Sequence, residues 1–164
     1  MQRALLSVTA ALMAGCALMQ PPVQAGDDVD TVRQKLGAPG AEYPLPDGSR
    51  KWAYPTSPFG RHTTMVTFDA DGRVQRWEEA LTETNFNALE AGLTKQQVLE
   101  RLGPPARVWA VRYHDQTVWT YRYNNTQCQV FHVGLTPGGV VEDTSYGPDP
   151  MCDRGRFMMG AWHR

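Results

Sequence analysis

The 164-residue sequence has little cysteine, no excess of charge of one sign and no long apolar run beyond its N-terminal segment. The formal net charge of −1 lacks the basic surplus with which nucleic-acid-binding proteins neutralise phosphates, so no nucleic-acid partner is expected. A helix that spans a membrane needs ~20 consecutive apolar residues, which the body of the chain does not have. The absence of a CxxC pair argues against a redox or zinc-binding cysteine pair.

Residues 1–25 have the composition of an export signal followed by a tether. Arg3 supplies a positive charge, an apolar stretch follows, and Met13-Ala14-Gly15-Cys16 resembles a lipobox, in which Cys16 is lipidated and becomes the first mature residue. A second interpretation places the cleavage after Val23-Gln24-Ala25, which would release a soluble protein. We favour lipidation of Cys16 because the apolar stretch ends there. Either cleavage implies that the body is exported.

Two cysteines remain once Cys16 is set aside, and export places them in an oxidising compartment. Cys128 and Cys152 are therefore predicted to form a disulfide that holds the C-terminal tail, residues 147–164, against the preceding sheet. Such a bridge requires the two Cα atoms to lie within about 7 Å of one another.

The sequence repeats itself with a period of 66 or 67 residues. The run VRQKLGAP at residues 32–39 returns as VLERLGPP at residues 98–105, and Trp52-Ala53-Tyr54 returns as Trp119-Thr120-Tyr121. Each copy places a helix-stopping Gly-x-Pro before strand-like segments. This period is too long for the common solenoid repeats and indicates a duplicated small α+β unit.

Apolar spacing predicts where the elements of each unit lie. Helices are expected over residues 28–36 and 94–102, the second opened by a capping box of Thr94 and Gln97 and preceded by a short helix over residues 85–91. Alternation of apolar and polar residues predicts strands that include residues 52–54, 64–68, 74–77, 119–123, 131–135 and 140–141, with residues 144–164 irregular.

The predicted fold is therefore α+β. It is a tandem repeat of a unit with one helix or a helix pair and three antiparallel strands, with the helices packed on one side of the sheet. The units are expected over residues 27–80 and 82–146. Two units are expected to share one core, because a single helix over three strands buries little apolar area.

The run GLTKQQV at residues 92–98, followed by Leu102-Gly103-Pro104-Pro105, resembles the signature of the SmpA/OmlA family. These are small outer-membrane lipoproteins that include the BamE subunit of the β-barrel assembly machine. The resemblance covers the second unit and implies an envelope protein at the periplasmic face of the outer membrane. It would be anchored through Cys16, with envelope proteins such as the β-barrel assembly machinery as partners. A tandem of this unit is also similar to the secreted β-lactamase inhibitor proteins, which implies a soluble periplasmic or secreted inhibitor as the alternative.

No catalytic, cofactor-binding or metal-binding constellation emerges from the sequence. The four histidines lack ligand spacing, and neighbouring Glu78 and Glu79 on a strand would point to opposite faces. The aromatic residues exceed what so small a sheet needs to bury, and on an open face they would form a protein-binding surface, with core packing as the alternative for each. The residues of that predicted surface are Trp109, Tyr113, Trp119, Tyr121 and Tyr123. The sequence thus predicts a non-enzymatic binding or scaffolding module that needs no cofactor.

Overall fold

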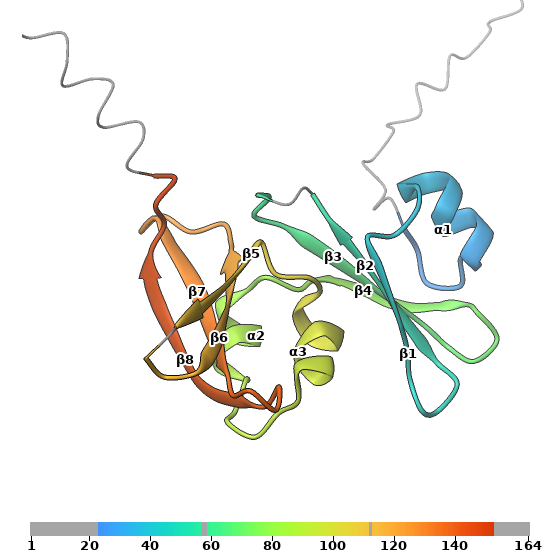
Figure 1. Ribbon diagram of the computed structural model, residues 1–164. Coiled ribbons are helices and arrows are strands. Elements are labelled where there is room, and N and C mark those ends of the chain that lie inside the picture. Colours follow the sequence, from blue (N-terminus) through green and yellow to red (C-terminus); the bar gives the residue numbers. More distant parts are fainter. Residues whose placement is uncertain (1–22, 57–58, 112, 153–164) are drawn as a thin grey trace, which may run out of the picture.

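The computed structural model describes residues 23–56, 59–111 and 113–152 (Figure 1). The predicted lipidation site, Cys16, and most of the predicted export signal lie outside the described residues. The elements are, in order, α1 (Val29–Leu36), β1 (Ala41–Pro44), β2 (Arg50–Pro55), β3 (Thr63–Phe68), β4 (Val74–Glu79), α2 (Glu83–Asn87), α3 (Lys95–Leu102), β5 (Arg107–Val111), β6 (Gln116–Arg122), β7 (Gln129–Leu135) and β8 (Val141–Pro148).

The described chain is mostly β, which corrects the predicted fold class. It forms two four-stranded antiparallel sheets with the strand orders β1-β2-β3-β4 and β5-β6-β7-β8, and its helices are short. The prediction of a tandem unit with three strands and helices on one side of the sheet is wrong. It missed β1 and β5, which are edge strands that pair with a neighbour on one side only.

The missed strands give weak sequence signals for a physical reason. β1 has only four residues, ends at Pro44 and buries one side chain, that of Tyr43. β5 buries none of its side chains. An edge strand with little burial does not need the strict alternation by which the inner strands were recognised. β8 also runs on to Pro148, through residues expected to be irregular, because it pairs with β7 along its whole length.

The helices lie on both faces of the first sheet. On one face, Val32 of α1 packs into a cluster with Trp52, Val66 and Phe68. On the other face, Leu99 of α3 packs against a second cluster, which consists of Tyr43, Ala53, Met65 and Ala80. Figure 1 shows α3 between the two sheets. The layers are therefore α1, the first sheet, α3 with α2, and the second sheet.

The helix ends follow the local chemistry of the sequence. Asp28 caps α1 by accepting a hydrogen bond from the backbone N–H of Thr31. Thr94 and Gln97 form the predicted capping box of α3, which is confirmed. Gly103 ends α3 with φ of 74°, and a Cβ there would lie 3.0 Å from Thr63 Cγ2 of the first sheet. Glycine at position 103 therefore allows both the positive φ that ends α3 and the close approach of α3 to the first sheet.

No helix in the described part of the chain is long and apolar enough to cross a membrane.

Candidate functional site

The five aromatic residues predicted to form one surface are divided between the two faces of the second sheet and a turn. Trp119, Tyr121 and Tyr123 are buried on the inner face, where they belong to the core formed with α2 and α3. These three residues are therefore corrected from surface to core. Trp109 lies on the outer face and is 40% exposed, and Tyr113, in the turn after β5, is 98% exposed.

The division follows from strand register. Trp109 pairs with Val118, so it shares the outer face with that residue, whereas Trp119 pairs with Val133 on the inner face. The sequence correctly placed Trp119 and Tyr121 of β6 and Tyr123, directly after β6, on a common face. The apolar spacing also predicted helices on one side of the sheet, but it did not show that α2 and α3 would cover the face that carries these aromatics.

The outer face of the second sheet holds a hollow of about 630 Å³. Its floor includes Trp109, Thr120 and His132, from three neighbouring strands. Met151, in the segment after β8, and Phe59, in the loop between β2 and β3, line it from outside the sheet. Its walls are mainly apolar, which is typical of a site that receives a side chain or a small ligand.

A chain of hydrogen bonds fixes the floor of the hollow. The indole Nε1–H of Trp109 donates to Thr120 Oγ1 over 3.1 Å, and this oxygen lies 3.0 Å from His132 Nδ1. Burial lowers the pKa of His132, so the ring is neutral near pH 7 and its Nδ1 shares a hydrogen bond with the Thr120 hydroxyl. The rings of Trp109 and His132 meet edge to face, with centroids 6.2 Å apart. The exposed Trp109 ring is therefore held in a fixed orientation before any partner binds.

Gly147 leaves room for the His132 ring. A Cβ at position 147 would lie 2.9 Å from His132 Nε2, which is closer than side-chain carbons approach. The His132 ring therefore packs against Gly147 of β8 on one side, and its Nδ1 lies beside Thr120 of β6 on the other.

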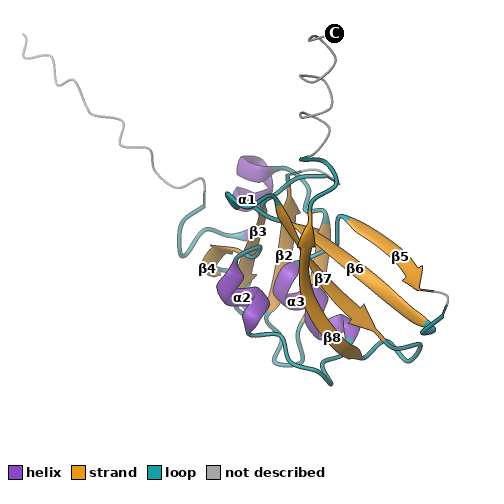
Figure 2. Cartoon of the chain, turned by 90° about the vertical axis from the view of Figure 1, so that its left-hand side faces the viewer, coloured by secondary structure: helices purple, strands orange, loops and turns teal. Residues whose placement is uncertain are grey.

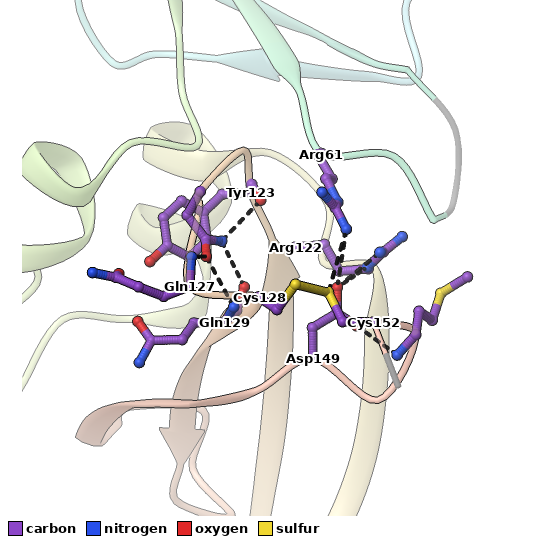
Figure 3. The surroundings of a disulfide bond; sticks show 10 residues. Arg61, Arg122, Tyr123, Gln127, Cys128, Gln129, Asp149 and Cys152 are labelled. Atoms are coloured by element: carbon purple, nitrogen blue, oxygen red, sulfur yellow. Dashed lines mark hydrogen bonds and ion pairs between the residues drawn. A yellow bond between two sulfur atoms is a disulfide. The ribbon is translucent and has the colours of Figure 1, made fainter. Parts of the chain in front are cut away.

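Arg122 and Asp149, which line the hollow, belong to an ion-pair cluster with Arg61. Figure 3 shows this cluster. Arg122 donates from Nε and Nη2 to Asp149 Oδ2 over 2.9 and 2.8 Å, and Asp149 is only 3% exposed. Arg61 Nη2 lies 3.8 Å from the same oxygen, and Arg122 Nη1 also donates to the carbonyl of Phe59. These contacts join the loop between β2 and β3 to the second sheet. They also give the Arg122 charge a partner inside the protein.

The disulfide lies beside this cluster (Figure 3). Cys128 and Cys152 are bonded, with their Cα atoms 5.9 Å apart, within the limit set by the sequence-based prediction. The Asn125 side chain accepts from the N–H groups of Gln127 and Gln129 and thereby shapes the loop in which Cys128 adopts φ of 54°. The N–H of Asp149 donates to the carbonyl of Cys128 over 2.7 Å. The segment after β8 is thus fixed by covalent and polar bonds beside the hollow.

His62 and Glu79 form another polar cluster, whose hydrogen bonds hold the local backbone in place. His62 Nδ1 lies 2.9 Å from Glu79 Oε2, while Glu79 Oε1 accepts from the backbone N–H groups of Thr63 and Leu81. Within residues 23–152, apart from the undescribed positions 57, 58 and 112, no three histidine, cysteine, aspartate or glutamate side chains gather as metal ligands would.

Comparisons with known proteins give neighbours in shape only. No protein-family model matches the chain, and no curated protein matches it. One solved structure to which it is similar is a DUF4309 family protein, YjgB, from Bacillus subtilis, with 17% identity over 74% of this chain and 78% of that chain and a TM-score of 0.30. Another is a beta-lactamase inhibitor-like protein from Streptococcus mutans, with 10% identity over 73% and 82% of the two chains and a TM-score of 0.33.

A third similar structure is a cysteine-rich secretory protein from Staphylococcus aureus, with 12% identity, 77% of this chain and 45% of that chain covered, and a TM-score of 0.30. These structures thus include an inhibitor-like protein, and similarity to β-lactamase inhibitor proteins is the second resemblance predicted from the sequence. The resemblance to the SmpA/OmlA family stays a prediction. At these identities and TM-scores the likenesses carry no argument about function.

Proposed function

We propose that this protein is an exported, non-enzymatic binding module that holds a partner protein on the outer face of its second sheet. The observation that carries the proposal is the exposed Trp109 ring, fixed by Thr120 at the floor of an apolar hollow. Tryptophan in such a setting dominates protein interfaces, because one ring buries a large area at little cost in conformational entropy. A floor already ordered by hydrogen bonds lowers that cost further.

The same surface serves either predicted role, inhibition of an enzyme or scaffolding in the envelope, because both require a partner side chain to enter the hollow. The segment after β8 is fixed beside the hollow by the disulfide, a bond that persists in an oxidising compartment. The proposed site therefore suits a protein that works outside the cytoplasm.

We place the mature N-terminus at Cys16 rather than after Ala25. Val23 is only 1% exposed and belongs to the core cluster beneath α1, so cleavage after Ala25 would remove a core side chain. Processing at Cys16 retains it. Seven residue steps separate Cys16 from Val23, a reach of at most about 25 Å, so a lipid on Cys16 would keep the body close to the outer-membrane surface.

Photo-crosslinking in cells tests the proposed surface. A photo-reactive p-benzoylphenylalanine at the exposed position 113 should give a discrete adduct with the partner. Trp109→Ala should abolish this adduct, whereas Trp77→Ala should leave it unchanged. Trp77 is a matched control because it is 42% exposed and lies on the other sheet. Equal adduct yields from the two variants would refute the proposed surface.

Metabolic labelling with a palmitate analogue tests the anchor separately. The wild-type protein should take up the label and the Cys16→Ser variant should not. Absence of label from the wild type, together with a mature N-terminus at Gly26, would refute processing at Cys16 while leaving the proposed binding surface untouched.

A further inference from the structure

Three of the four strand edges in the described sheets are protected against pairing with another chain. β1 is short and ends at Pro44, which has no N–H to donate. β4 is paired at its first residue, since Gly26 N–H donates to the carbonyl of Val74, and the rest of the strand carries the charged residues Arg76, Glu78 and Glu79. The start of β8 is paired in the same way through Gly92 N–H and the carbonyl of Val141, and this strand also carries two acidic residues, Glu142 and Asp143.

β5 carries none of these protections. It contains no proline and no acidic residue, and among the described residues its strand partner is β6 alone. Val108, 55% exposed, and Trp109 project from its two opposite faces. Figure 2 shows β5 at the rim of the second sheet, away from the helices. An uncovered apolar edge of this kind is a template for an added strand.

We propose that β5 pairs with an extended segment of the partner, which adds a fifth strand to the second sheet. This inference rests on the proposed function and specifies how the partner binds. Backbone hydrogen bonds to β5 supply affinity, and the side chains of the added strand on the outer face lie beside Trp109 and cover the hollow. Alternate residues of the partner segment are therefore apolar.

Charge indicates an acidic residue at the end of this segment that lies beside Arg107. Arg107 begins β5 and lines the hollow, and it has no ion pair with any other described residue. Arg122, the other cation of the hollow, is already paired with Asp149. The chain's own residues 153–164 fit this edge less well, because they contain three arginines and one aspartate. A partner segment with alternating apolar residues and an acidic end is the complementary occupant, and glutamates at both ends of a test peptide allow either strand direction.

Amide hydrogen exchange measured by NMR on the whole exported protein tests the inference. The probe is a synthetic peptide of alternating valine and threonine with two glutamates at each end. At saturation it should slow exchange of alternate amides within Arg107–Val111 by about tenfold or more, because only every second N–H of an edge strand faces an added strand. The same peptide with lysine ends should bind at least about tenfold more weakly.

A backbone-methylated version of the acidic peptide is the matched control. It keeps every side chain but cannot form the ladder hydrogen bonds, so it should give no protection of β5. The inference would be overturned if the methylated peptide bound as tightly as the unmethylated acidic peptide, or if the acidic peptide gave no alternating protection of β5.

Two further outcomes would assign the edge to a different occupant and also overturn the inference. Protection of β5 without peptide that rises with protein concentration would indicate a second copy of the chain. Protection without peptide at every concentration would indicate another part of this chain. If Trp109→Ala abolishes the crosslink to the partner while β5 shows no alternating protection, the proposed function stands and the added strand is refuted.

Discussion

Replacement of Val23 by alanine should destabilise the protein, although this residue precedes every helix and strand in the described part of the chain. The Val23 side chain is fully buried against the cluster of Val32, Trp52, Val66, Phe68 and Val74. The substitution removes two methyl groups, each worth about 0.8 kcal/mol in transfer free energy, and leaves a small cavity. We therefore expect the free energy of unfolding to fall by about 2 kcal/mol.

Thermal and urea unfolding followed by circular dichroism measure this effect. A loss of about 2 kcal/mol corresponds to a fall in Tm of about 5 °C for a chain of this size. The matched control is Val108→Ala, the same chemical change at a side chain that is mostly exposed, for which we expect a loss below about 0.5 kcal/mol. Equal unfolding midpoints for the two variants would refute the packing of Val23 and remove the structural reason to prefer processing at Cys16.

Three other perturbations have expected outcomes. Asp149→Asn should lower the free energy of unfolding by about 3 kcal/mol, because it leaves the buried Arg122 charge without its partner; a urea midpoint equal to that of the wild type would contradict this. Reduction of the Cys128–Cys152 bond, which spans 24 residues, should cost about 3.5 kcal/mol through loop entropy, measured by unfolding with and without dithiothreitol. Burial lowers the pKa of His132 in the folded state, so the contribution of this residue to stability is complete above about pH 6.5 and is lost as the pH falls towards the folded-state pKa. Urea unfolding at several pH values between about 5 and 8 should therefore show that the free energy of unfolding changes less with pH in the His132→Gln variant than in the wild type.

Helix ends and inner strands could be predicted from the sequence because local chemistry determines them. The repeated Gly-x-Pro motif was correctly interpreted as a helix stop, and both Gly37 and Gly103 follow a helix with positive φ. The inner strands β6 and β7 were recognised because burial on one face enforces alternation. These features depend on neighbours a few residues away.

The edge strands β1 and β5 and the open face of the second sheet could not be predicted in this way. β5 has no buried side chain, so its five residues show no pattern that separates a strand from a loop. Which face of β6 is covered depends on α2 and α3, and the hollow beside Trp109 is lined partly by the loop carrying Phe59 and by the segment after β8. Such features depend on contacts between distant segments, of which hydrophobic periodicity carries no record.

The position of α3 between the two sheets has a consequence for how the molecule can be divided. Leu99 packs against the clusters of both sheets, and Lys51 Nζ of the first sheet donates to the carbonyl of Glu100 over 3.1 Å. A cut in the backbone between Leu81 and Thr82 would leave the first fragment with Met65 and Ala53 uncovered on one face. The second fragment would carry the helix that fits there. The two pieces should therefore reassemble on mixing, which makes the chain suitable as a split reporter whose signal depends on an interface the protein already contains.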